Sequence, residues 1–168
     1  MAERILIPTD GSDEVVTVVD EALDLDCGGE SEIHSLYVVD HRALVPLGEG
    51  EQQSVAEMLR DTGETALDTV SERVRDRQPD FDVSTMVAQG LPARQILAYA
   101  QEHEIDTIVL GSHGQTLQQQ AIGSTTERVV RGVNQIENTK VVIVPIGDQG
   151  EREDVEEAIS ERASDMFQ

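Results

Sequence analysis

Residues 107–131, with the sequence TIVLGSHGQTLQQQAIGSTTERVVR, decide the fold expected of this chain. They begin with a short apolar run, Ile108-Val109-Leu110, whose length is typical of a buried parallel strand. The run ends in a predicted turn, Gly111-Ser-His-Gly114. Further on, Gly123-Ser-Thr-Thr-Glu127 has the pattern of a helix start, with Ser124 at the N-cap and Glu127 at the third helical position, which is a capping box.

A strand, a glycine-bounded loop and a capped helix together predict an anion site. The first N–H groups of a helix have no partners within it, glycine lets a ligand approach the main chain, and the helix dipole favours negative charge. We therefore expect a phosphate group to bind at this stretch. Two plainer interpretations stay open, because a capping box needs no phosphate and the glycines can serve turn geometry alone.

The rest of the chain alternates between short apolar runs and amphipathic patterns. Strands are expected at residues 4–7, 33–39, 83–88, 106–110 and 140–146, and helices at residues 13–26, 54–77, 93–102 and 125–133. This alternation predicts a doubly wound α/β fold, in which a parallel sheet has right-handed crossovers and helices on both faces. The strand at 83–88 is expected at an edge of the sheet, and residues 41–53 are expected to form a loop.

Two separate stretches are expected to meet at one site. In a doubly wound sheet, ligands bind outside the carboxyl ends of the strands, where the strand order reverses. The first predicted strand ends at Pro8-Thr9-Asp10 and the fourth at Leu110-Gly111. These two strand ends are the natural neighbours at such a crevice.

The composition narrows the choice of partners. The chain has 168 residues, enough for one domain, and 12 Lys and Arg against 34 Asp and Glu give a net charge of -22. Because this charge repels phosphate backbones and anionic lipid, nucleic acid and membrane surfaces are not expected partners. Acid spread along a chain whose only lysine is Lys140 is typical of a protein working in concentrated salt. Equal stability in molar potassium chloride and in dilute buffer would contradict that hypothesis.

The single cysteine, Cys27, allows no internal disulfide, no zinc site built on cysteines and no CxxC pair. No signal peptide is recognised at the start, and no apolar run approaches the roughly 18 residues that cross a bilayer. We expect a soluble, cytoplasmic protein. No GxxxxGK[ST] loop or GxSxG elbow is present, and the four histidines lack the spacing of a metal site, so catalysis is not expected.

Three motifs together resemble the universal stress protein family. They are ILIPTDGS at residues 5–12, LYVVD at residues 36–40, and Gly111-Ser-His-Gly114 with Gly123-Ser124 ahead of the last predicted helix. The resemblance covers residues 3–146. It implies a five-stranded parallel sheet in the order 3-2-1-4-5, a Rossmann-like fold of the adenine nucleotide alpha hydrolase type. It also implies binding of ATP, with Mg²⁺ as an optional companion ion, and a homodimer formed through the last strand, residues 140–146.

The resemblance also implies where a nucleotide would lie. Asp10 would lie near the adenosine, Val38 against the adenine, and the glycines of the loop around ribose and phosphates. The full set implied to contact the nucleotide is Pro8, Thr9, Asp10, Val38, Gly111, Ser112, His113, Gly114, Gly123, Ser124, Thr125 and Thr126. Each has a plainer alternative: Asp10 could cap the first helix, Val38 could be core, and His113 could be structural in its loop.

One departure from the family's pattern bears on function. Eight residues separate Gly114 from Gly123, where nucleotide-binding members usually have nine, and none of the eight is basic. The charge of ATP would then need Mg²⁺, the helix dipole and salt for compensation. Three functions therefore stay open: an ATP-binding regulatory module, a dimerisation protein that binds no nucleotide, and, ranked last, a slow ATP hydrolase.

The chain changes character after Pro145. Residues 1–147 are expected to form the domain that resembles the family, and residues 148–168 an acidic extension. The extension has the apolar spacing of an amphipathic helix, which could dock on its own domain, dock on a partner subunit or remain solvated. Its apolar residues are Val155, Ala158, Ile159, Ala163, Met166 and Phe167.

Overall fold

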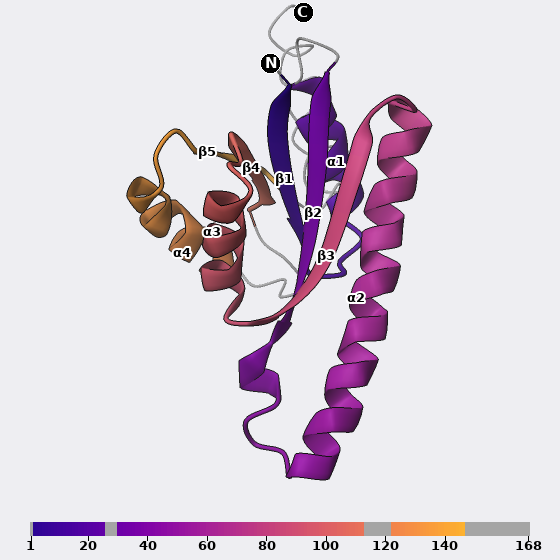
Figure 1. Ribbon diagram of the computed structural model, residues 1–168, viewed down its shortest axis with the longest axis vertical. Helices are drawn as coiled ribbons and strands as arrows, with labels where there is room; N and C mark the ends of the chain where they lie inside the picture. The colour runs from indigo at the N-terminus through magenta and orange to yellow at the C-terminus, as the bar shows by residue number, and fades with distance from the viewer. Residues whose placement is uncertain (1, 26–29, 113–121, 147–168) are drawn as a thin grey trace, which may run out of the picture.

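The central strand β1 (Glu3–Thr9) organises a five-stranded sheet in this computed structural model, which describes residues 2–25, 30–112 and 122–146. All of the strand pairs are parallel, and the order is β3-β2-β1-β4-β5 (Figure 1). The other strands are β2 (Ser31–Asp40), β3 (Asp82–Gly90), β4 (Thr107–Gly111) and β5 (Lys140–Val144). The predicted fold and strand order are confirmed, and β3 is an edge strand as expected.

Helices cover both faces of this sheet. They are α1 (Val15–Asp24), α2 (Glu49–Arg77), α3 (Pro92–Glu102) and α4 (Ser124–Gly132), with short 3₁₀ turns η1 (His41–Ala43) and η2 (Val133–Gln135). One apolar cluster joins α1 and α2 to one face, and a second joins α3 and α4 to the other. A bidentate salt bridge between Arg73 of α2 and Asp20 of α1 connects these two helices.

The core follows from the position of β1 between two helical layers. Ile5, Leu6 and Ile7 are consecutive and all fully buried. Because successive side chains of a strand point to opposite faces, such a run is stable only where both faces are covered. Ile5 and Ile7 pack in the cluster with α1 and α2, and Leu6 packs in the cluster with α3.

The second helix differs from its prediction. The segment expected to be a loop contains η1, and α2 begins at Glu49, within that segment. Gly48 forms the N-cap, and Glu49 and Glu51 in the first turn are stabilised by the helix dipole. Glu49 and Glu51 are therefore the sequence signal for this helix start, because acidic residues favour the first turn of a helix.

The amino-terminal half of α2 lies outside the main core. We call residues 41–62 the arm, since α2 runs past the carboxyl ends of the strands (Figure 1). The buried residues of α2 begin only at Gly63, and Met58 is 58% exposed. A small cluster around Leu44, which includes Tyr37 and Leu67, attaches the arm to the sheet.

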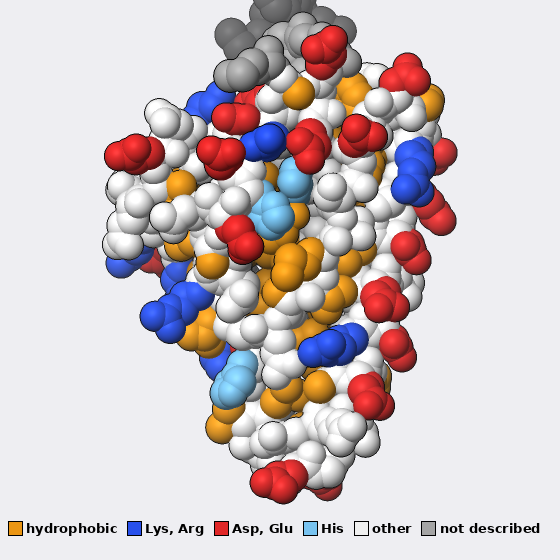
Figure 2. Space-filling view, in the orientation of Figure 1, with side chains coloured by type: hydrophobic (Ala, Val, Ile, Leu, Met, Phe, Trp, Pro, Cys, Tyr) orange, Lys and Arg blue, Asp and Glu red, His pale blue; other side chains and the backbone are white. Residues whose placement is uncertain are grey.

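Ion pairs connect neighbouring elements at the amino ends of the strands. Arg4 contacts Glu32 and Glu104, each at 3.3 Å, and its main-chain N–H donates to Asp106 at 2.9 Å. Lys140 of β5 lies 3.6 Å from Glu3 of β1. Elsewhere on the visible face, acidic side chains are spread over the surface, as the composition predicted (Figure 2).

A buried histidine lies beside these ion pairs. His34 is 4% exposed, and its Nδ1 lies 2.8 Å from the hydroxyl of Tyr99. Its Nε2 lies 3.1 Å from Glu32, close enough for an ion pair on protonation but not aligned for a hydrogen bond. The ring of His103 stacks on Tyr99 at 4.0 Å between centroids. Burial lowers the pKa of His34, more strongly than Glu32 raises it.

None of the helices in the described part of the chain is long and apolar enough to cross a membrane. The predicted C-terminal extension, residues 148–168, lies outside the described residues, so the two-part division stays a prediction.

Candidate functional site

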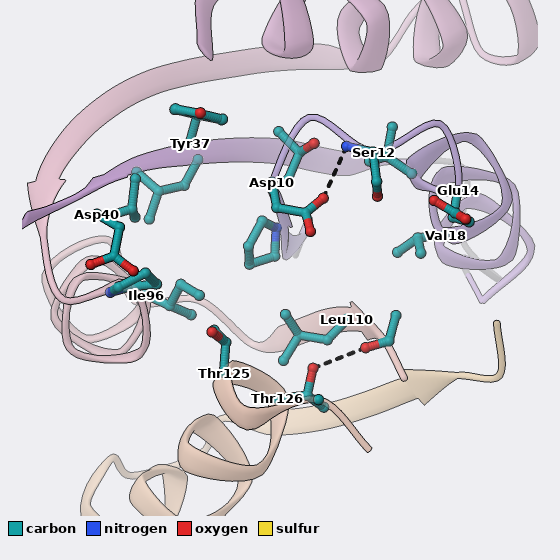
Figure 3. Close-up of a pocket in the computed structure, with 18 of the residues that line it drawn as sticks. Asp10, Ser12, Glu14, Val18, Tyr37, Asp40, Ile96, Leu110, Thr125 and Thr126 are labelled. Atoms are coloured by element: carbon teal, nitrogen blue, oxygen red, sulfur yellow. Dashed lines mark hydrogen bonds between the residues drawn. The ribbon is translucent and has the colours of Figure 1, made fainter. Parts of the chain in front are cut away.

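A cavity of about 420 Å³ lies at the carboxyl ends of β1, β2 and β4 (Figure 3). This volume is in the range of small-molecule sites, roughly 300–1,000 Å³. The cavity is lined from β1 and its following loop by Pro8, Thr9, Asp10 and Ser12, from β2 by Leu36, Tyr37, Val38 and Asp40, from β4 by Leu110 and Gly111, and from the start of α4 by Gly123, Ser124, Thr125 and Thr126. The predicted convergence of the first and fourth strand ends is thus present, at the point where the strand order reverses.

Asp10 stands at the end of β1 in a turn that it stabilises itself. Its Oδ1 accepts from the N–H of Ser12 at 3.0 Å, and the hydroxyl oxygen of Thr9 accepts from the N–H of Gly11 at 3.2 Å. Gly11 has φ of 84°, a conformation that favours glycine. The N-cap of α1 is Glu14, so the alternative that Asp10 caps the first helix is wrong. Asp10 is exposed at the cavity, opposite Thr125 (Figure 3).

The start of α4 differs by one residue from the predicted capping box. Gly123, not Ser124, is the N-cap: its carbonyl accepts from the N–H of Glu127 at 3.0 Å, and Ser124 is the first helical residue. The side chain of Glu127 instead pairs with Arg131 at 2.6 Å, one turn along the helix. The reason is a bond outside the helix, since the N–H of Gly123 donates to the carbonyl of Ser112 at 2.6 Å and fixes the chain there.

A glycine N-cap leaves the first turn of α4 open toward the cavity. Gly123 has no side chain to cap the helix, and no side-chain capping bond is formed. The first N–H groups of a helix have no acceptor within it, and Ser124, Thr125 and Thr126 all line the cavity. The anion site therefore retains its physical basis without the capping box.

Turn geometry does not account for Gly111 or Gly123. Among the described residues, the glycines with positive φ are Gly11 and Gly90. Gly123 has φ of −70° and ψ of 156°, which any residue adopts. Gly111 also lacks a positive φ. What a glycine adds at these two positions is the absence of a side chain beside the cavity.

Two of the predicted contact residues use their hydroxyl groups within the protein. Thr126 is 5% exposed and donates to the carbonyl of Gly111 at 2.9 Å (Figure 3). Ser112 is 7% exposed, bonds to the main chain of Ile146 and does not line the cavity. The side chain of Ser112 therefore points to Ile146 and not into the cavity. His113 and Gly114, also predicted contacts, lie outside the described residues.

Val38 and Tyr37 form the wall from β2. Val38 is half-buried, lines the cavity and packs against the cluster under α3, so its core role and its predicted ligand role do not exclude each other. The ring of Tyr37 packs on Gly63 of α2 so closely that a Cβ at Gly63 would collide with it. Burial raises the pKa of Tyr37, and the charge of Asp10 raises it further.

The charged groups of the lining are all acidic. Asp10, Glu14 and Asp40 line the cavity, and its described lining contains no Lys, Arg or His. Asp40 bonds to the side chain of Arg42 at 2.6 Å, which holds the pKa of this carboxyl below its ordinary value. A polyanionic ligand would therefore need compensation from the α4 start and from a cation. Within residues 2–25, 30–112 and 122–146, no three His, Cys, Asp or Glu are grouped to hold a metal by themselves.

The sequence missed several lining residues. Tyr37 and Asp40 had a usable signal, because the rule that ligands bind at strand carboxyl ends applies to β2 as well as to β1 and β4. Glu14 could also have been suspected from its place after the Asp10 turn. Leu59 of the arm and Ile96 of α3 gave no such signal, since their positions depend on how the helices pack over the strand ends.

Comparison with known proteins agrees with this architecture. The family model of the universal stress proteins matches residues 1–145. The chain belongs to the universal stress protein family. A universal stress protein of Methanocaldococcus jannaschii is 31% identical over 134 residues, covering 79% of this chain and 78% of that protein.

Solved structures show the same fold. The structure of protein MJ0577 superimposes on this universal stress protein with a TM-score of 0.76. The two chains are 24% identical, and the match covers 89% of this chain and 99% of that one. A universal stress protein in complex with cAMP is 19% identical, with a TM-score of 0.59 over 86% of this chain and 97% of that one. At these identities the two structures establish the fold alone.

Proposed function

We propose that this universal stress protein binds an adenine nucleotide, with ATP as the leading candidate, and acts as a stress-response regulatory module. The observation that carries the proposal is the open first turn of α4, capped by Gly123 and facing a cavity with Asp10 on its other side. The family membership supports a stress-response role. The cAMP complex of a distant member supports a nucleotide as the ligand class.

The lining residues divide into two groups with different chemistry. The N–H groups of Ser124 and Thr125, and the exposed hydroxyl of Ser124, are suited to phosphoryl oxygens. Asp10 can accept hydrogen bonds from ribose hydroxyl groups or from an adenine amino group, with Pro8 and Thr9 beside it. Val38 offers an apolar surface for the adenine ring. Mg²⁺, when bound with the nucleotide, would offset phosphate charge facing three lining carboxylates.

A second function stays in competition because of those carboxylates. An acidic cavity is also what a family member that binds no nucleotide, and works only through protein contacts, could carry. Hydrolysis of a bound nucleotide ranks last, and we assign no catalytic residue. Binding data separate the first two functions directly.

The experiment combines released ligand and titration. The protein is purified in about 2 M KCl, as suits its net charge of -22, then denatured, and small molecules are identified by chromatography. With no Trp and two Tyr, its own absorbance near 280 nm is low, so bound adenine raises the 260/280 ratio clearly. Calorimetry then tests ATP, ADP, cAMP and adenosine, with and without Mg²⁺. No released nucleotide and no binding of any of the four would contradict the proposal.

Two acidic residues of one loop provide a matched pair of variants. Asp10→Ala removes a lining carboxylate, and Asp13→Ala removes an exposed carboxylate of the same loop that does not line the cavity. We expect Asp10→Ala to weaken adenosine and ATP about tenfold, or roughly 1.4 kcal/mol, and Asp13→Ala to change them less than twofold. Equal effects of the two variants would show that Asp10 acts only through its charge.

We also propose a homodimer through β5. This strand is the other edge of the sheet, and Val141, Val142 and Ile143 are only half-buried. An apolar edge strand is a ready surface for pairing with another chain. Light scattering should give twice the 18.4 kDa mass of the chain. The hydrogen bonds of Lys140 and Val144 show that the even-numbered residues of β5 bond to β4, so the N–H of Ile143 points to the free edge. Ile143→Pro, which removes this free-edge donor, should give the monomer mass, whereas a monomeric parent protein would contradict the proposal.

A further inference from the structure

Ser112 connects three parts of the chain directly behind the cavity. It follows β4, is 7% exposed, and uses its main chain and its side chain in different directions. Its N–H donates to the carbonyl of Val144 at 2.8 Å and so continues the β4–β5 ladder. Its carbonyl accepts from the N–H of Gly123 at 2.6 Å, which sets the N-cap of α4.

The hydroxyl group of Ser112 is committed to Ile146. Its Oγ accepts from the N–H of Ile146 at 2.9 Å and lies 3.4 Å from the carbonyl of the same residue. In a parallel ladder the next bond would run from the N–H of Ile146 to the carbonyl of Ser112, but that carbonyl accepts from the N–H of Gly123. A side-chain hydroxyl therefore takes the place of a ladder bond where the regular pairing stops.

Two of the three hydrogen-bond partners of Ser112 belong to the cavity wall. Gly123 lines the cavity as the N-cap of α4, and Ile146 lines it from the end of β5 while its side chain packs in the cluster with α1. Thr126 gives α4 a second attachment, through its bond to Gly111. Ser112 does not line the cavity itself, but it connects two residues that do, Gly123 and Ile146, and so fixes the distance between them.

We infer that Ser112 is a positioning residue for the phosphate-binding end of the cavity. It holds the first turn of α4 and the Ile146 end of β5 at a fixed separation, and the ligand it serves is the nucleotide of the proposed function, on which this role rests. Alanine would keep both main-chain bonds of Ser112 but leave the buried N–H of Ile146 without its acceptor. The wall would then relax next to α4, while the Asp10 side of the cavity would stay unchanged.

The test compares Ser112→Ala with Ser35→Ala. Ser35 is fully buried and donates its hydroxyl hydrogen to the carbonyl of Ile7 at 2.9 Å, and neither Ser35 nor Ile7 lines the cavity. By calorimetry, we expect Ser112→Ala to weaken Mg-ADP five- to tenfold and adenosine less than twofold. Ser35→Ala should leave both affinities within twofold, and Ser112→Thr, which keeps the hydroxyl, should recover most of the affinity for Mg-ADP.

Hydrogen exchange on the ligand-free protein keeps this inference separate from the proposed function. In Ser112→Ala, the amide of Ile146 and the hydrogen-bonded amides at the start of α4, those of Gly123 and Glu127, should exchange at least tenfold faster than in the parent and in Ser35→Ala. Unchanged exchange at both places, or equal losses of Mg-ADP and adenosine affinity, would overturn the positioning role. A parent protein that binds no nucleotide would instead overturn the proposed function, and the exchange rates would still decide the role of Ser112.

Discussion

The two ends of the sheet use their polar groups in opposite ways, although the same five strands form both. At the amino end, Arg4 joins Glu32 and Glu104, and Lys140 lies beside Glu3. At the carboxyl end, the strands stop around a cavity where the charged lining residues, among those the structure describes, are all carboxylates. The chain has only 12 Lys and Arg residues, and two of them, Arg4 and Lys140, form ion pairs at the amino ends of the strands.

This difference separates stability from binding within one sheet. Contacts at the amino end join β1, β2, β5 and the end of α3 to one another, so their loss should lower the free energy of unfolding. Hydrogen bonds at the carboxyl end mostly shape loops, as in the turn of Asp10 and the tether of Gly123, so their loss should change ligand affinity first. Two substitutions and one change of pH, each with a comparison variant, test this division from the largest expected effect to the smallest.

Gly63→Ala should have the largest effect, because it alters both packing and the cavity. A Cβ at this position collides with the ring of Tyr37, which lines the cavity. Inserting a methyl group into a packed contact costs about 1–3 kcal/mol of unfolding free energy. Denaturant unfolding measures the loss, and calorimetry should show weakened nucleotide binding in the same variant.

Gly50→Ala is the matched control in the same helix. A Cβ at Gly50 meets nothing within 4 Å, so this variant should be neutral or more stable by up to about 1 kcal/mol. If both glycine variants lost equal stability, the contact between α2 and Tyr37 would not be the cause. A destabilised Gly63→Ala with unchanged affinity would show that Tyr37 does not shape the ligand site.

Arg4→Met should have an intermediate effect, confined to stability. The variant keeps the aliphatic stem and removes the contacts to Glu32, to Glu104 and to the carbonyl of His103. Because the Arg4 side chain is 41% exposed, screening limits the expected loss to about 1 kcal/mol. Thermal unfolding measures this loss, and nucleotide affinity should stay within twofold of the parent.

Arg131→Met gives the comparison for a fully surface-exposed pair. Its contact with Glu127 is an exposed pair one turn apart on α4, worth a few tenths of a kcal/mol. A loss from Arg4→Met no greater than that from Arg131→Met would contradict a special role for the amino end. A tenfold loss of nucleotide affinity in Arg4→Met would contradict the division itself.

Acidification should produce the smallest effect, through His34. Because burial lowers the folded pKa of His34, the unfolded chain binds this proton more readily. The stability contributed by the neutral imidazole is complete above the unfolded pKa of about 6.5 and is lost as the pH falls below it, toward the folded pKa. One such group changes the unfolding free energy by at most about 1.4 kcal/mol per pH unit.

Variants of two histidines isolate this contribution from that of the many carboxylates. The groups that face His34 are Glu32 on β2, Tyr99 and His103 on α3, and Arg4 on β1. His34→Gln should flatten the loss of unfolding free energy between pH 7 and 6, whereas His103→Gln should keep it because His34 remains. Identical pH profiles for the parent and His34→Gln would remove His34 as the cause.

The predictable part of the structure depended on local patterns. The run Ile5-Leu6-Ile7 predicted a strand covered on both faces, and the alternation of elements predicted the parallel sheet. The family resemblance implied its strand order, which the structure confirms. The strand-end rule brought Asp10 and Gly111 together, and both line the cavity.

The parts that could not be predicted depend on contacts between distant residues. The N-cap of α4 is Gly123 and not the predicted Ser124, because the N–H of Gly123 bonds to the carbonyl of Ser112, eleven positions earlier. A local capping pattern cannot reveal such a distant bond. The side chain of Ser112 is turned toward Ile146 by the pairing of β4 with β5. Leu59 lies within the predicted helix, but it reaches the cavity because of how α2 packs over the strand ends, which apolar spacing does not reveal.

The arm gives the cavity one wall that is not part of the sheet. Ala43 and Leu59 line the cavity, yet the arm to which they belong is attached mainly through the small cluster around Leu44. The strands and α4 hold their side of the cavity with main-chain hydrogen bonds, whereas the arm holds its side with side-chain contacts, which are the cluster around Leu44 and bonds from Arg42 to Asp40 and from Arg60 to Gln89. The position of this wall therefore depends on the side-chain contacts of the amino-terminal half of α2 and on no strand pair.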